Sequence, residues 1–130
     1  MTSIVGTWKL AQAAARDAAG VALPAPYGGK GIGRVTFTAD GRMMSVVCDG
    51  RRELPAGTPR EYSSYCSNYT FDGSRLVTRV DAASDPSRIG SDQVRGVRFE
   101  EGRMILSPPP RRAGGSEEYR ELTWERIASE

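Results

Sequence analysis

Short runs of alternating apolar and polar residues fill most of the chain, and three similar turn sequences interrupt them. The turns read Ala39-Asp40-Gly41-Arg42, Phe71-Asp72-Gly73-Ser74-Arg75 and Glu100-Glu101-Gly102-Arg103. Asp-Gly between two such runs is the strongest short-range signal for a β-hairpin, and Glu-Gly is a weaker relative. The pattern therefore predicts three hairpins, with strands at 33–38 and 42–48, at 67–71 and 75–81, and at 91–99 and 103–107.

Two further strand-like runs, Ile4 to Ala15 and Glu117 to Ile127, flank the hairpins and bring the expected number of strands to eight. The remaining connections are longer and rich in Pro, Gly and Ser. If successive strands pair antiparallel, the tight turns gather at one end of the sheet and the long connections at the other. Eight such strands can close into a barrel that has room for side chains or one small ligand. We therefore predict an all-β, eight-stranded up-and-down antiparallel barrel, with long connections at 16–32, 49–66, 82–90 and 108–116.

One segment has helical rather than strand character. Thr58 fits an N-cap, Pro59 the first helical position and Glu61 the closing residue of a capping box. These signals predict a short helix over 59–65 at the open end of the barrel, carrying Tyr62 and Tyr65 as a lid or plug.

The apolar parity of each strand predicts which side chains face inward. Large apolar groups fall near the tight-turn end and indicate a packed core there. Residues 43–47 are apolar on both faces, so alternation does not decide between them, although Met44, Val46 and Cys48 form the more apolar set. The core expected at the tight-turn end comprises Trp8, Phe37, Phe71, Phe99, Met104 and Trp124.

Polar residues of the inward parity fall toward the loop end. A mostly apolar cavity with a few placed polar groups is typical of a small-molecule site, and a buried arginine needs an anionic or hydrogen-bonding partner. The pattern leaves open whether Arg95 and Arg120 enter the cavity or reach solvent. The expected ligand-binding residues are Gln12, Cys48, Tyr62, Tyr65, Thr78, Gln93, Arg95 and Arg120.

Length, charge and composition limit the classes of protein to which this chain can belong. The 130 residues suffice for one domain, and 18 basic against 16 acidic side chains are interspersed, unlike a nucleic-acid-binding surface. No apolar run is long enough for a membrane span and no signal peptide is evident, so we expect a cytoplasmic protein.

The absence of His excludes Ser-His-Asp and Cys-His nucleophile systems. We expect Cys48 and Cys66 to be reduced thiols, no metal or cofactor, and solvated arginines in the loops at Arg51, Arg52, Arg111 and Arg112.

Several segments resemble known β-barrels. Ile4-Val5-Gly6-Thr7-Trp8 is similar to the Gly-X-Trp signature of lipocalins. The stretches 38–43, 65–73 and 122–126 resemble the bacterial lipocalin-like domain family. The resemblance implies one calycin-type β-barrel domain over residues 1–130. In lipocalins an arginine of the last strand stacks over the signature tryptophan, which implies a structural contact between Arg126 and Trp8.

Three functions are compatible with these observations. The first is binding of a small, largely apolar molecule, aromatic or carboxylate-bearing, that meets Gln93, Arg95 or Arg120. The second, suggested by the resemblance to small cyclases and isomerases, is catalysis with Arg95 stabilising an enolate-like charge. The third is an interaction module filled by its own methionines. No sequence feature specifies or excludes a homodimer. Acid or base candidates for the second function are Glu61, Tyr62 and Tyr65, and filling candidates for the third are Met43, Met44 and Met104.

Overall fold

The computed structural model describes residues 2–113 and 116–129. Its helical parts are two 3-10 turns, η1 (Pro26–Gly29) and η2 (Pro86–Arg88), and the described residues contain no helix long and apolar enough to cross a membrane. Gly114 and Gly115 of the expected connection 108–116 lie outside the described residues. The strands are β1 (Gly6–Asp17), β2 (Ala22–Leu23), β3 (Gly31–Phe37), β4 (Arg42–Asp49), β5 (Tyr62–Phe71), β6 (Arg75–Ala83), β7 (Asp92–Glu100), β8 (Arg103–Ser107), β9 (Arg111–Ala113) and β10 (Ser116–Ala128).

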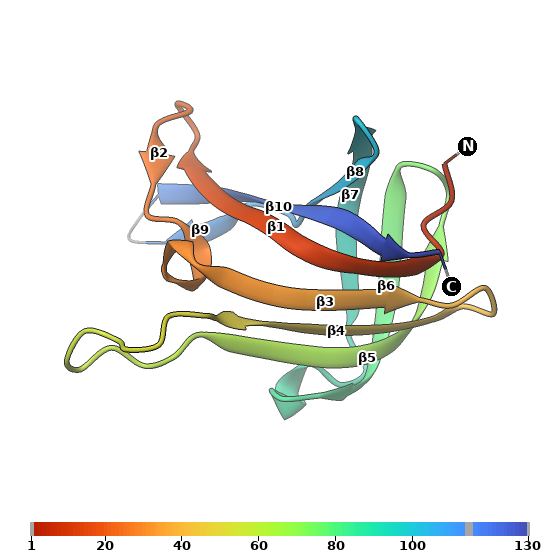
Figure 1. The fold of residues 1–130 in the computed structure, drawn as a ribbon, viewed down its shortest axis with the longest axis horizontal. Coiled ribbons are helices and arrows are strands. Elements are labelled where there is room, and N and C mark those ends of the chain that lie inside the picture. Colours follow the sequence, from red (N-terminus) through yellow and green to blue (C-terminus); the bar gives the residue numbers. More distant parts are fainter. Residues whose placement is uncertain (1, 114–115, 130) are drawn as a thin grey trace.

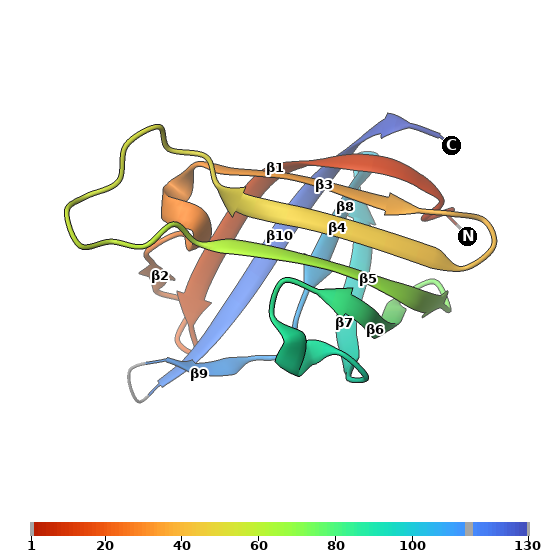
Figure 2. The same ribbon diagram turned by 90° about the horizontal axis from the view of Figure 1, so that it is seen from below.

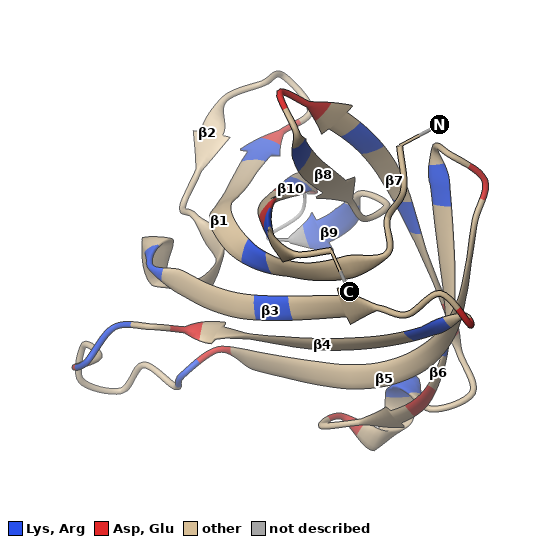
Figure 3. Ribbon diagram, turned by 45° about the vertical axis from the view of Figure 1, so that its right-hand side comes forward, with Lys and Arg blue, Asp and Glu red and all other residues tan. Residues whose placement is uncertain are grey.

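Eight of these strands close into an antiparallel barrel (Figure 1). Strands β3 to β8 pair in sequence order, β8 pairs with β10, and β10 pairs with β1, which returns to β3. The short strands β2 and β9 extend β1 and β10 at the loop end (Figure 2). Basic and acidic residues are distributed over many strands rather than gathered on one (Figure 3). The predicted all-β, eight-stranded up-and-down barrel is confirmed.

Local turn chemistry fixes the three tight connections. Thr38 N donates to Arg42 O at 2.8 Å, and Asp72 N donates to Arg75 O at 3.2 Å. Gly41, Gly73 and Gly102 have φ values of 93°, 105° and 79° in these turns, a region that favours glycine because it has no Cβ. The N- and C-terminal ends of the chain lie at this same end of the barrel (Figure 1).

The closed end of the barrel is filled by aromatic and aliphatic side chains. Trp8 is 1% exposed, and its Nε1 donates to Ile4 O at 3.0 Å. The Arg126 guanidinium carbon lies 4.2 Å from the centre of a Trp8 ring, while Nη2 of the same group donates to Ser3 O at 2.6 Å and Nη1 donates to Val5 O. The arginine therefore joins β10 to the segment that precedes β1. The core cluster consists of Ile4, Trp8, Leu10, Val35, Phe37, Met43, Val47, Leu76, Val97, Met104, Leu106 and Trp124.

The helix predicted over 59–65 is wrong. Residues from Tyr62 onward belong to β5 and pair with β4, with Tyr62 opposite Cys48 and Tyr65 opposite Ser45. The β5 backbone pairs with seven residues of β4 and forms its hydrogen bonds there. The free energy gained from this sheet pairing outweighs the local preference for a helix that the capping residues provide. Glu61 closes no capping box. Its carboxylate accepts instead from the backbone nitrogen of Tyr27 at 2.9 Å.

The structure orients residues 43–48, which alternation left open, and it places Cys48 on the outer face instead of in the expected ligand site. Met43, Ser45 and Val47 face inward, whereas Met44 and Val46 are 59% and 47% exposed. The reason is register, because paired residues of neighbouring strands share a face. Phe37 pairs with Met43 and Val35 with Ser45, and both β3 residues point into the core. Cys48 therefore lies on the outer parity of β4.

An irregularity in β1 moves Gln12 to the outside. Leu10 pairs with Trp124 and Gln12 with Thr123, so Ala11 is an extra residue in the ladder. A β-bulge of this kind reverses the inward and outward alternation beyond it. Gln12 is exposed, and Ala15 is the buried residue at the far end of the strand.

Candidate functional site

A cavity of about 490 Å³ opens at the loop end of the barrel. Its volume lies within the usual range for small-molecule sites. The cavity argues against the filled-barrel hypothesis, because Met43 and Met104 pack into its wall or the core beneath it and Met44 points to solvent. Its lower wall is apolar and is formed mainly by Val35, Met43, Val47, Leu106, Leu122 and Trp124.

The mouth of the cavity is polar and charged. Its residues come from elements far apart in the sequence, namely η1, β5, η2, β7, β9 and β10. Four arginines face two glutamates, so two positive charges have no carboxylate to offset them. The polar lining residues are Tyr27, Glu61, Tyr62, Ser63, Tyr65, Arg88, Gln93, Arg95, Arg111, Glu118 and Arg120.

Two of the four arginines are neutralised within the protein. Glu118 Oε1 accepts from Nε of Arg111 and from Nε of Arg120, each at 2.7 Å. Arg120 Nη1 also lies 3.6 Å from Glu61 Oε2. Burial acts to raise the pKa of Glu118, but the hydrogen bonds from Arg120 and Arg111 outweigh it and hold that pKa below its usual value. The Arg111 side chain is 57% exposed, as expected, and it also borders the cavity.

The other two arginines, Arg88 and Arg95, have neutral partners. Gln93 Oε1 accepts from Arg88 Nη2 at 3.1 Å and from Arg95 Nη2 at 3.4 Å. Arg88 Nη1 donates to Ser63 Oγ at 3.0 Å, and Arg95 Nη1 donates to Val94 O at 3.0 Å. Among the described residues, no carboxylate forms an ion pair with either. Burial lowers the pKa of Arg95, yet an arginine stays protonated in proteins.

Two tyrosines add hydrogen-bonding groups beside these charges. The Arg88 guanidinium carbon lies 4.4 Å from the centre of the Tyr65 ring. Within the described part of the chain, the hydroxyls of Tyr27 and Tyr65 have no hydrogen-bond partner, and both residues line the cavity. Burial, followed by the nearby charge of Glu61, raises the pKa of Tyr27, so its phenol is neutral and able to donate.

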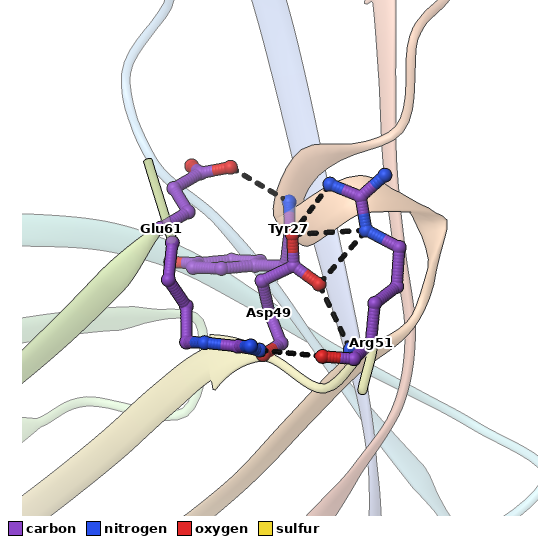
Figure 4. Close-up of polar contacts among 5 residues, drawn as sticks. Tyr27, Asp49, Arg51 and Glu61 are labelled. Carbon is purple, nitrogen blue, oxygen red and sulfur yellow. Dashed lines mark hydrogen bonds and ion pairs between the residues drawn. The ribbon is translucent and has the colours of Figure 1, made fainter. Parts of the chain in front are cut away.

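A compact ion-pair cluster fixes the loops at one side of the mouth (Figure 4). The buried carboxylate of Asp49 accepts from Arg51 N at 3.0 Å and from Arg51 Nη2 at 2.7 Å, which lowers the pKa of Asp49. Arg60 Nη1 donates to the carbonyls of Asp49 and Arg51. Glu61 holds the backbone of Tyr27 in η1. The two ends of the loop 50–61 are therefore joined to each other, and Glu61 attaches one of them to η1. Arg51 was expected to be solvated, but it is 30% exposed and ion-paired with Asp49.

Five of the eight expected ligand-binding residues line the cavity. They include Arg95 and Arg120, whose orientation the sequence pattern left open. Thr78 faces inward but lies outside the cavity wall, fully buried, with its hydroxyl donating to Gln93 O at 3.3 Å. Gln12 and Cys48 lie on the outer parity, for the reasons given above. The five that line the cavity are Tyr62, Tyr65, Gln93, Arg95 and Arg120.

Sequence reasoning missed several cavity residues because loops and long-range pairing bring them there. Arg88 lies in η2 and Tyr27 in η1, and neither turn has an alternation pattern to follow. The sequence did contain a signal for Ser45. A hairpin with the 38–41 turn pairs Phe37 with Met43, so Met43 faces inward with Phe37, and Ser45, two residues later, faces inward too. The missed lining residues include Tyr27, Ser45, Ser63, Arg88, Arg111 and Glu118.

The two cysteines and the acidic residues form no metal site among the described residues. Cys48 and Cys66 are both free thiols. Neither belongs to the cavity wall.

Comparison with known protein families agrees with the barrel fold. The family model described as a lipocalin-like domain matches residues 5–127, nearly the whole chain. Neither a comparison with curated proteins nor one with solved structures returned a match. Because the match extends from the first strand of the barrel to the last, the chain belongs to the lipocalin-like domain family.

Proposed function

We propose that this protein binds a small, largely apolar molecule bearing a carboxylate, with the anion between Arg88 and Arg95. The observation that supports this most strongly is the pair of partly buried arginines that meet at one neutral acceptor, Gln93 Oε1, at the mouth of an apolar cavity. A lipocalin-like fold is consistent with a small apolar ligand but does not identify it.

The electrostatic argument concerns desolvation. A buried charge is costly unless it is paired, and guanidinium groups bind carboxylates through charge-assisted hydrogen bonds. Arg111 and Arg120 already have Glu118 and Glu61, so they offer an anion less net charge. Arg88 and Arg95 have only neutral acceptors among the described residues. A carboxylate that joins them would pair both charges while its hydrocarbon part covers the apolar lower wall.

The proposal is tested with two ligands that share a ten-carbon chain and differ in the head group, which is an anionic carboxylate in one and a neutral hydroxyl in the other. Titrations of decanoic acid and 1-decanol, followed by the emission of the cavity residue Trp124 and by calorimetry, give the two dissociation constants. A hydrogen bond to a charged group contributes about 1.5–3 kcal/mol, so we expect the acid to bind at least about tenfold more tightly. In the double variant Arg88→Gln/Arg95→Gln the difference should shrink to about twofold.

The matched control is Arg79→Gln, which removes an exposed arginine paired with Asp92 on the outside of the barrel. This variant should keep the full preference for the acid. Equal affinities of the wild-type protein for acid and alcohol, or an undiminished preference in the double variant, would overturn the proposal.

A second candidate is isomerisation or cyclisation inside the same cavity. It is favoured by the hydroxyls of Tyr27 and Tyr65, which have no partner among the described residues and lie in the same cavity lining as Arg88 and Arg95. A neutral phenol can donate a proton while guanidinium groups stabilise an enolate-like oxygen. Glu61 and Tyr62 are weaker candidates, since Glu61 is engaged by Tyr27 N and Arg120 and the Tyr62 hydroxyl donates to Ser64 Oγ.

Enolisation can be measured directly. With 4-phenyl-2-oxobutanoate in deuterated water, an enzyme accelerates loss of the C3 proton signal above the buffer rate, and Tyr65→Phe slows this exchange while binding is retained. A rate equal to that of buffer, in the presence of demonstrated binding, would count against catalysis.

A further inference from the structure

A polar side chain, Ser45, interrupts the apolar lower wall of the cavity. It lies on β4 between the inward-facing residues Met43 and Val47, and it is 9% exposed. Its register partners are Val35 on β3 and Tyr65 on β5. Among the described residues, none forms a hydrogen bond with the Ser45 hydroxyl. Ser45 as a residue is therefore nine-tenths buried, and its hydroxyl lines the cavity without a partner in the described part of the chain.

Buried polar groups are nearly always hydrogen-bonded, so a hydroxyl that lines a cavity and lacks a protein partner is available to a bound molecule. The interior serine on the neighbouring strand shows the difference. Ser67 is fully buried and outside the cavity wall, and its hydroxyl donates to Met43 Sδ at 3.5 Å. Trp124 also lines the cavity and its Nε1 has no acceptor among the described residues, but that atom is buried and out of reach of a ligand. Ser45 therefore gives the lower wall a hydroxyl that a ligand can reach and that no described residue satisfies.

The position of Ser45 relative to the arginines limits which ligand atom can reach it. Directly paired residues on adjacent strands have Cβ atoms about 5 Å apart, so Ser45 is next to Tyr65. The Tyr65 ring in turn lies 4.4 Å from the guanidinium carbon of Arg88. An anion held at Arg88 and Arg95 therefore places carbons near its own head group, and not the far end of its chain, beside the Ser45 hydroxyl.

We infer that the ligand is an oxygenated carboxylic acid, with a hydroxyl or keto oxygen a few bonds from the carboxylate, and that Ser45 selects for this oxygen. A serine hydroxyl both donates and accepts, so it suits either form of the oxygen. The inference rests on the proposed binding of a carboxylate at Arg88 and Arg95. It adds that an unsubstituted acid leaves Ser45 without a partner and binds less tightly.

Four probes test the inference: decanoic acid and its 3-hydroxy, 5-hydroxy and 10-hydroxy derivatives. With the wild-type protein, we expect the 3- or 5-hydroxy acid to bind at least about fivefold more tightly than decanoic acid. The 10-hydroxy acid should gain nothing, because its hydroxyl would enter an apolar region. In Ser45→Ala the favoured hydroxy acid should lose its advantage and bind within about twofold of decanoic acid.

Two further variants make the test specific. Ser67→Ala removes the other interior hydroxyl and should keep the preference, while Ser45→Cys provides a near-isosteric replacement if Ser45→Ala does not fold. If decanoic acid binds as tightly as the 3- and 5-hydroxy acids, or if their advantage survives in both Ser45 variants, the inference is wrong and carboxylate binding stands. If none of the acids binds more tightly than 1-decanol, the proposed function itself fails.

Discussion

The guanidinium of Arg88 is stacked over the ring of Tyr65, with 4.4 Å between its central carbon and the ring centre. The contact joins η2, a three-residue turn, to the start of β5. It leaves the edges of the guanidinium free to donate, and they reach Ser63 Oγ and Gln93 Oε1. The Tyr65 ring therefore holds a charged group from a loop in one orientation at the cavity mouth.

Replacing Tyr65 separates the role of its ring from that of its hydroxyl. Partly desolvated cation-π contacts contribute about 1–2 kcal/mol, so Tyr65→Leu should weaken decanoate binding by about five- to thirtyfold. Tyr65→Phe retains the ring and should bind decanoate within about twofold of the wild-type protein. Calorimetric titration of both variants provides the measurement. If the leucine variant binds as well as the phenylalanine variant, the ring does not orient Arg88 for the ligand.

The features that could be predicted from sequence are those that short segments encode. The 38–41 turn needs Gly41 at positive φ and Thr38 to pair with Arg42, and these residues are contiguous. The inward parity of β10 places Arg126 at the level of Trp8, because the two residues are direct partners in the ladder. Local alternation and turn chemistry were therefore sufficient to predict the barrel fold.

The remaining features depend on contacts between distant segments. Ser45 faces inward because β4 is in register with β3, although the alternative parity is more apolar. Gln12 faces outward because one residue, Ala11, is inserted in the ladder with β10. Arg88 reaches the cavity because η2 folds back against β5. No window of a few residues contains these relationships, so alternation could not orient β4 or place the loop residues, and it turned Gln12 the wrong way.

Arg126→Gln should lower stability without altering the cavity. The substitution removes the contact with Trp8 and the hydrogen bonds to Val5 O and Ser3 O, far from the arginines at the mouth. The lost cation-π contact alone amounts to about 2 kcal/mol, which lowers Tm by several degrees in a domain of this size. Calorimetric unfolding measures the change. Arg103→Gln, which breaks an exposed pair with Glu125, should have little effect, and equal losses in the two variants would contradict the structural role of Arg126.

Gly28→Ala should disturb the cavity rim more than the conformational strain of alanine explains. Gly28 has φ of 66°, and a Cβ there would lie 2.3 Å from the guanidinium carbon of Arg51. Gly20 is the matched control, with φ of 86° and no atom within 4 Å of such a Cβ. A left-handed conformation costs a non-glycine residue about 1–2 kcal/mol, so Gly20→Ala measures strain alone. Urea denaturation should show a larger loss for Gly28→Ala, and equal losses would mean that Arg51 moves aside at no cost.

The ion pair between Asp49 and Arg51 should make the free energy of unfolding of the protein depend on pH at acidic pH. The hydrogen bonds and charge of Arg51 hold the pKa of Asp49 in the folded protein below its usual value, whereas the unfolded chain keeps a value of about 3.9. Below that unfolded value the unfolded state binds more protons, so the contribution of Asp49 is complete at neutral pH and is lost as the pH falls below about 4.

Asp49→Asn should therefore destabilise the protein most at pH 7 and least in strong acid. The asparagine keeps the size of the side chain but not its charge, so the buried end of Arg51 loses its counter-ion at neutral pH. As the pH falls through the folded pKa of Asp49, the wild-type carboxyl also becomes neutral and the two proteins converge. Urea denaturation from pH 7 to pH 2 measures the difference in unfolding free energy. Asp92→Asn, which removes the partner of the exposed Arg79, is the control and should change stability little at any pH. A difference between wild type and Asp49→Asn that is constant over this range would show that the charge of Asp49 does not stabilise the rim.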